Sequence, residues 1–180
     1  MDAYSFSDLR SAASSRLHNF SALANSINEA KSRHLRTAFL CHSHKDRDLA
    51  LGLKTIIEGQ GGTLYIDWLD EEMPETPNRT TAQRIKGKIV ESDLFMFLAT
   101  PNSMVSRWCP WEIGYADGKK PIDSIVVVPT KDDAGRYYGN EYLQLYRRLE
   151  PSTYRASYWQ PPAPTVIRPG EYSGVPVQQL

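Results

Sequence analysis

The sequence predicts an α/β fold in which a parallel sheet carries helices on both faces. Between residues 37 and 150, short apolar runs alternate with segments whose apolar residues recur at helical spacing. This alternation is typical of parallel sheets, because each crossover between parallel strands is usually a helix. The run Asp93–Thr100 (DLFMFLAT) is apolar at nearly every position, as expected for a strand buried on both faces at the centre of such a sheet.

Four strands are predicted from short apolar runs: Thr37–Cys41, Thr63–Trp68, Asp93–Thr100 and Ile122–Val128. The helices that alternate with them are expected at 46–58, from about 80 to 90, at 108–118 and at 140–150. Glycines 59, 61 and 62 are expected to end the first helix. Thr80 or Thr81 is expected to cap the second, and Pro110 is tolerated in the first turn of the third. Residues 69–79 and 101–107 are predicted to be loops.

Three regions can be separated along the 180 residues, a length that favours one domain with short extensions. Residues 1–36 form an N-terminal helical extension, in which apolar residues recur at helical spacing from Leu9 to Ile27 and predict one amphipathic helix. Residues 37–150 form the α/β domain. Residues 151–180 contain six prolines and form a tail that cannot be a regular helix, so we expect it to lie extended over the surface or to lack order.

Composition excludes several classes of protein. The chain has 21 basic and 21 acidic side chains, and this balance argues against nucleic-acid binding and against a polybasic membrane anchor. No apolar run approaches the ~18 residues that span a bilayer, and the first residues lack the pattern of a secretory signal. With two cysteines and no disulfide framework, a reducing cytoplasm is the expected location.

Ligands of parallel sheets bind beyond the carboxyl ends of the strands, so the loops at 42–45, 67–79 and 100–112 are the candidates for a site. The first of these loops (HSHK) stands where a dinucleotide-binding fold would carry its GxGxxG motif. Zinc binding by Cys41, His42, His44 and Cys109 is a weak alternative, because no CxxC or HxxxH spacing accompanies them. A Ser43–His44 nucleophile pair is also weak without a GxSxG motif. Cys41 is more simply a buried thiol.

The other two loops carry acids beside aromatic side chains. Asp67 lies at the end of the second strand beside Trp68, which can either stack on a flat ring or pack in the core. The acids at 70–75 are more simply a solvated loop. Glu112 falls in the first turn of a helix among Trp108 and Trp111, where it is either a helix-start residue or a catalytic acid in an aromatic pocket.

Three segments resemble the Toll/interleukin-1 receptor (TIR) domain family. Residues 39–46 (FLCHSHKD) are similar to its first box, F-x-S-[HY]-x-x-x-D, with Cys41 in place of the serine. Residues 106–112 (SRWCPWE) resemble the S-x-W-C-x-x-E segment that carries the catalytic glutamate of TIR enzymes, and residues 65–70 (YIDWLD) resemble the strand that enters the long BB loop. The resemblance covers roughly residues 37–130. The chain looks most like bacterial stand-alone TIR proteins of the ThsB type, which belong to Thoeris anti-phage defence.

This resemblance implies a flavodoxin-like fold and an enzyme that cleaves NAD⁺ at the nicotinamide–ribose bond, as an NAD⁺ nucleosidase and ADP-ribosyl cyclase. The implied product is a signalling ADP-ribose derivative, such as a cyclic isomer, that activates a separate effector protein. NAD⁺ is then a substrate, and no cofactor or metal is implied. Glu112 is the expected catalytic residue. The expected substrate-binding residues are Phe39, His42, Ser43, Asp67, Trp68, Trp108 and Trp111.

The resemblance leaves a second function open, because TIR domains also act as adaptors that assemble by self-association without chemistry. Glu112 would then be a structural residue. The acidic loop at 70–75 would dock on a basic partner surface, such as one around Arg84, Lys86 and Lys88.

Overall fold

The structure is a computed structural model that describes residues 2–15, 27–70, 78–139, 141–151 and 163–177. Five strands form a parallel sheet in the order β3–β2–β4–β5–β7. Antiparallel strands β8 and β9 extend the sheet beyond β7, and β1 and β6 pair with the carboxyl end of β5. The strands are β1 (Tyr4–Ser5), β2 (Thr37–Cys41), β3 (Thr63–Tyr65), β4 (Leu94–Ala99), β5 (Ile125–Lys131), β6 (Tyr137–Tyr138), β7 (Arg147–Glu150), β8 (Thr165–Ile167) and β9 (Gly174–Pro176).

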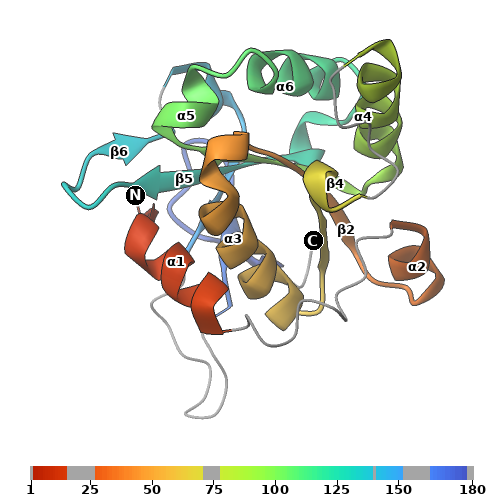
Figure 1. The fold of residues 1–180 in the computed structure, drawn as a ribbon. Coiled ribbons are helices and arrows are strands. Elements are labelled where there is room, and N and C mark those ends of the chain that lie inside the picture. Colours follow the sequence, from red (N-terminus) through yellow and green to blue (C-terminus); the bar gives the residue numbers. More distant parts are fainter. Residues whose placement is uncertain (1, 16–26, 71–77, 140, 152–162, 178–180) are drawn as a thin grey trace.

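Helices cover both faces of the sheet, which confirms the predicted α/β architecture (Figure 1). Helices α1 (Phe6–Ser15) and α3 (Arg47–Gly59) pack on one face, and α2 (Ile27–Ser32), α4 (Arg79–Glu91) and α6 (Cys109–Asp117) pack on the other. The short helix α5 (Pro101–Met104) follows β4. Single 3-10 turns lie at η2 (His44–Asp46), η3 (Asp67–Leu69), η4 (Ile122–Ser124) and η5 (Glu141–Leu145).

Alternate residues of each central strand supply the two cores. In β2, Ala38 and Leu40 belong to the core under α3, whereas Phe39 and Cys41 belong to the core under α4 and α6. All six residues of β4 are buried, as a central strand requires. The pairing of β2 with both β3 and β4 brings the ends of three strands to one edge of the sheet.

Several local predictions need correction. The second strand ends at Tyr65, and Asp67–Leu69 turns into η3. Asn78, rather than Thr80 or Thr81, caps α4, because its side chain accepts hydrogen bonds from the amides of both threonines. The loop expected after β4 begins with α5, which Thr100 and Ser103 stabilise through a reciprocal capping box.

The predicted helix at 140–150 is wrong. Residues 141–145 form η5, and Arg147–Glu150 form β7, which pairs with β5 on one side and β8 on the other. Leu143, Tyr146 and Leu149 are buried at a spacing that also suits a helix. The helical spacing of these apolar residues gave the wrong prediction, because the strand β7 depends on pairing with β8, which comes from the proline-rich tail.

The two terminal regions contribute to the same sheet and its cover. The helix predicted from Leu9 to Ile27 is seen as α1, which ends at Ser15, and as α2, which begins at Ile27; residues 16–26 lie outside the described residues. In the tail, β8 and β9 join the edge of the sheet rather than lying over the surface, and Val166 and Ile167 are buried. Residues 152–162 and 178–180 lie outside the described part. Within it, no helix is long and apolar enough to cross a membrane.

Candidate active site

A cavity of about 260 Å³ opens at the carboxyl ends of β2 and β3. All three loops singled out in the sequence contribute to it: the turn after β2, the start of η3, and the segment that leads into α6. Helix α4 closes one side. The lining residues are His42, Ser43, His44, Lys45, Asp67, Thr81, Ile85, Ser106, Trp108 and Glu112.

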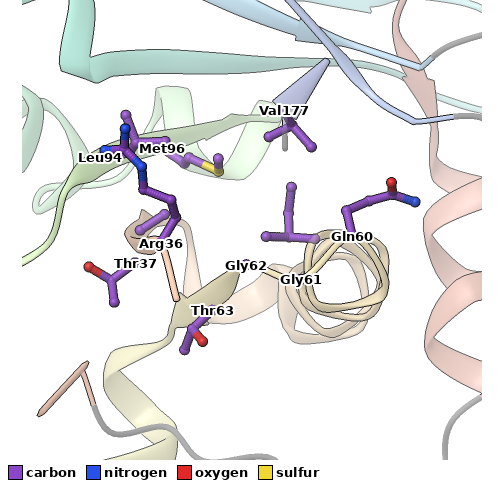
Figure 2. A pocket seen from close by; sticks show the side chains of 11 residues that line it. Arg36, Thr37, Gln60, Gly61, Gly62, Thr63, Leu94, Met96 and Val177 are labelled. Atoms are coloured by element: carbon purple, nitrogen blue, oxygen red, sulfur yellow. The ribbon is translucent and has the colours of Figure 1, made fainter. Parts of the chain in front are cut away.

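Two smaller cavities lie elsewhere. One, of about 60 Å³, lies at the amino ends of β2, β3 and β4, beside the end of α3 (Figure 2). Its described lining holds no carboxylate and no histidine, and Leu94, Met96 and Val177 make much of it apolar. The other, of about 110 Å³, lies between β5, η5 and the turn after β8. Of these three cavities, the one at the carboxyl edge is lined by carboxylates and histidines.

Glu112 lies in the first turn of α6 and is 6% exposed. Burial raises the pKa of Glu112 well above its usual range, and the nearby Cys109 thiol adds to this rise. The nearby Cys41 thiol opposes this rise. A cation placed in the cavity would stabilise the charged form of this carboxylate.

Cys41 and Cys109 are both buried free thiols. The Cys41 thiol donates to the Cys109 carbonyl oxygen at 3.8 Å. Among the described residues, no group of three or more histidine, cysteine or acidic side chains is arranged to hold a metal ion.

His42 is held by two hydrogen bonds at the back of the cavity. Its Nδ1 lies 3.2 Å from the Leu40 carbonyl oxygen, and its Nε2 lies 2.8 Å from the indole Nε1 of Trp68. Because an indole nitrogen can only donate, His42 Nε2 accepts and Nδ1 carries the proton. Burial lowers the pKa of His42, which agrees with this neutral tautomer.

His44 and Asp67 form a pair at the mouth of the cavity. His44 Nε2 lies 3.2 Å from Asp67 Oδ2, and the other oxygen of Asp67 accepts from the Trp68 amide at 2.9 Å. The hydrogen bond to Asp67 raises the pKa of His44. Burial opposes ionisation of Asp67, but the hydrogen bonds from His44 and from the Trp68 amide keep the pKa of this carboxyl below its usual value. From the sequence, His44 was a weak candidate for zinc binding and for a nucleophile pair with Ser43. Its position after a strand adjacent to that of Asp67 was the available signal.

The three tryptophans expected at the site have different environments. Trp108 lines the cavity and meets Trp111 edge to face, with ring centroids 5.4 Å apart. Trp111 is outside the lining, is 36% exposed and stacks on Tyr115. Trp68 also lies outside the lining, where it holds His42 and lies under the guanidinium of Arg47 at 4.9 Å. One tryptophan therefore faces the cavity directly.

Ser43 lines the cavity, and its hydroxyl caps η2 by accepting from the Lys45 amide. Phe39 is placed differently from the expectation. It is 1% exposed and lies in the core between the rings of Tyr65 and Phe95, each with its centroid at 5.8 Å. Phe39 supports the sheet under the cavity and is not among its lining residues.

Asp46, the acid of the first box, was not assigned a role in the sequence. It is buried and accepts hydrogen bonds from the Thr100 hydroxyl at 2.5 Å and the Asn102 amide at 2.6 Å. These bonds tie the turn after β2 to the start of α5. Asp46 thereby fixes the positions of two of the three loops that surround the cavity.

Comparison with known proteins agrees with this arrangement. Residues 38–159 match the TIR domain family, and this range contains every lining residue of the cavity. A relative from Bacillus cereus (strain MSX-D12), named probable 3′ cyclic ADP-D-ribose synthase ThsB′, is 36% identical over 110 residues. That match covers 60% of this chain and 57% of the relative, so the chain spans little more than half of the relative's length. The family match covers well over half of the chain, and the protein belongs to the TIR domain family.

Proposed function

We propose that this protein cleaves NAD⁺ at the nicotinamide–ribose bond and converts the rest into a signalling ADP-ribose derivative, with a cyclic isomer as the expected form. The observation that carries the proposal is Glu112, a buried carboxylate that lines the cavity at the carboxyl edge of the sheet. The name of the Bacillus cereus relative, a probable 3′ cyclic ADP-D-ribose synthase, supports the same chemistry.

The chemistry requires one carboxylate. Nicotinamide leaves NAD⁺ as a neutral molecule, so the leaving group needs no proton. The ribose carbon that it leaves acquires the positive charge of an oxocarbenium ion, as in glycoside hydrolysis. Glu112 stabilises this charge and binds the ribose hydroxyls. Because the charge is largest in the transition state, this interaction accelerates cleavage.

The aromatic side chains of the site have separate roles in this proposal. Trp108 faces the cavity, where it stacks on a base and keeps water from the cation. Trp68 acts through His42, whose ring it fixes by a hydrogen bond. Trp111 supports Trp108 from outside the cavity. Ser43 and Asp67 supply polar contacts to the ribose, and His42, whose ring nitrogens are both engaged, shapes the cavity wall.

The size of the cavity supports a proposal about assembly. Its volume of about 260 Å³ lies below the range of about 300–1,000 Å³ that is typical of small-molecule sites. In this proposal the cavity takes the nicotinamide–ribose half of NAD⁺, and the adenosine half extends beyond it. We therefore propose that self-association through TIR surfaces completes the site. The nucleotide product then activates a separate effector protein in anti-phage defence.

The proposal is tested by incubating the purified protein with NAD⁺ and measuring free nicotinamide. Glu112→Gln keeps the shape of the side chain and removes its charge, so release of nicotinamide should fall at least about 100-fold. Glu171→Gln is the matched control, because Glu171 is exposed in the turn before β9, and it should behave as the unmodified protein. Undiminished release from folded Glu112→Gln would refute the assignment.

Complete absence of turnover, even in assembled protein, would favour the adaptor function instead. The residues proposed to dock in that case are only partly available in the structure. Lys86 lies over the rings of Trp111 and Tyr115, and Lys88 pairs with Glu91. Of the acidic loop, residues 71–75 lie outside the described residues.

A further inference from the structure

We propose that His44, oriented by Asp67, is the general base that accepts the proton of the attacking ribose hydroxyl and thereby directs the reaction to a cyclic product. The inference rests on the proposed function and deepens it, because it concerns what happens after nicotinamide has left. It gives His44 a role other than zinc binding or the activation of Ser43.

The need for a base follows from the bonds that form and break. When nicotinamide leaves, the electron pair of the carbon–nitrogen bond goes to the nicotinamide ring, and the ribose carbon becomes cationic. A hydroxyl oxygen of the adenosine ribose then donates a lone pair to that carbon and forms a carbon–oxygen bond. The oxygen must lose its proton for the product to be stable. The sum is NAD⁺ giving cyclic ADP-ribose, nicotinamide and one proton.

The geometry of the pair suits His44 to receive this proton. His44 and Glu112 line the same cavity, so one ligand can reach both. The hydrogen bond of 3.2 Å from Nε2 to Asp67 places the proton of the neutral ring on Nε2 and leaves the lone pair on Nδ1. Asp67 also stabilises the cation that forms when Nδ1 is protonated, as an acid beside a catalytic histidine does.

Asp67 and His44 differ in their exposure to solvent, and each exposure suits a different role. The side chain of Asp67 is 14% exposed and is fixed at its other oxygen by the Trp68 amide, so it holds a constant direction. The side chain of His44 is 61% exposed. A proton taken from the substrate at Nδ1 can therefore pass to bulk water, which resets the base for the next turnover.

The other described lining residues are less suited to this step. Both ring nitrogens of His42 are engaged, one with the Leu40 carbonyl and one with Trp68. Ser43, Thr81 and Ser106 offer hydroxyl groups, which are weak bases. Glu112 faces the cation and is required there. His44 is the lining side chain that combines basicity, a charged partner and access to solvent.

The experiment measures two products separately: nicotinamide, which reports cleavage, and the ratio of cyclic to linear nucleotide, which reports the fate of the cation. His44→Gln keeps an N–H that can donate to Asp67 but has no nitrogen that takes up a proton. Because a general base contributes about 100-fold or more, the cyclic-to-linear ratio should fall about 100-fold. Release of nicotinamide should stay within about threefold, since water can capture the cation without this base.

Two further variants keep the test decisive. Asp67→Asn removes the charge that supports His44 and should lower the ratio in the same direction, even if one of the two variants folds poorly. His34→Asn is the control, because His34 is exposed in the turn before β2 and has a φ of 57°, which asparagine tolerates. It should leave both the ratio and the release of nicotinamide unchanged.

The remaining outcomes overturn the inference. An unchanged cyclic-to-linear ratio in folded His44→Gln would show that the His44–Asp67 pair has only a structural role. An equal fall of nicotinamide and cyclic product would assign His44 to binding or cleavage. If the unmodified protein releases nicotinamide but forms only linear ADP-ribose, this inference fails and cleavage stands. If it releases no nicotinamide, the proposed function fails together with the inference.

Discussion

At the scale of single residues, the site depends on polar groups buried at a cost to stability. Glu112 lines the cavity beside the Cys41 thiol, and burial raises its pKa. The sequence located this residue through its position in residues 106–112, but its burial and its contact with Cys41 depend on packing between β2 and α6. The His44–Asp67 pair was not predicted, because its two members are 23 residues apart and meet only when β2 and β3 pair.

Glu112→Gln should increase the free energy of unfolding at neutral pH. The carboxyl has a higher pKa in the folded state than in the unfolded state, so its stabilising effect is complete below the ordinary glutamate pKa and is lost as pH rises through the folded value. Glutamine has no such dependence. Chemical denaturation at a series of pH values should therefore show an advantage of the variant that grows from about pH 4 toward neutrality. A variant that is less stable than the parent at pH 7 would contradict the burial cost inferred for Glu112.

At the scale of elements, the central strands were predictable and the edges were not. β2 and β4 match their predicted ranges within one residue, because apolar runs buried on both faces have a strong signal in sequence. β7 was mistaken for a helix, since a four-residue strand at this position depends on its neighbours β5 and β8. Helix α5 has four residues and depends on the capping box of Thr100 and Ser103. In the sequence, so short a helix cannot be told apart from a turn.

The contact between α1 and α3 requires a glycine at position 52. A Cβ atom there would lie 1.9 Å from the Leu9 carbonyl oxygen in α1. Gly52→Ala should therefore destabilise the protein by about 1–3 kcal/mol, as overpacking does. Gly87→Ala, in the interior of α4 with no atom within 4 Å of the added methyl group, should instead stabilise it by about 0.5–1 kcal/mol. Denaturant unfolding of both variants checks the sign, and equal effects would refute the close α1–α3 contact.

The strand assignment of residues 147–150 has its own test. Leu149 is fully buried in the core under α1 and α3, so Leu149→Ala should cost about 2–5 kcal/mol of unfolding free energy. Leu145 is 62% exposed in η5, and Leu145→Ala should change stability by less than about 0.5 kcal/mol. Chemical denaturation followed by circular dichroism measures the unfolding free energy of both variants. Similar losses of unfolding free energy in the two would contradict the described packing of β7.

At the scale of the whole molecule, the parallel sheet explains why distant segments make one site. The turn after β2, the start of η3 and the first turn of α6 meet because parallel strands end at the same edge. The zero net charge conceals a local arrangement in which a cavity lined by acids and histidines accompanies basic residues on α4. The fold class and this edge were predictable from sequence, whereas the cavity volume and the pairing of side chains within it were not.

The proposed assembly predicts that activity depends on protein concentration. If a second copy completes the site around the adenosine half of NAD⁺, nicotinamide released per milligram of protein should fall on dilution through the dissociation constant of the assembly. Sedimentation velocity at the same concentrations should show the assembly dissociating over the same range. Constant specific activity in samples that sediment as monomers would show that one chain suffices.

The central claim is that the Glu112 cavity cleaves NAD⁺ and retains the ribosyl cation for cyclisation. Its most direct test is mass spectrometry of the nucleotides formed when the purified chain is incubated with NAD⁺, beside Glu112→Gln. We predict that nicotinamide and a product with the mass of cyclic ADP-ribose accumulate together in the unmodified protein and that both are lost in the variant. Intact NAD⁺ after incubation with assembled, folded protein, or equal product from Glu112→Gln, would contradict the claim.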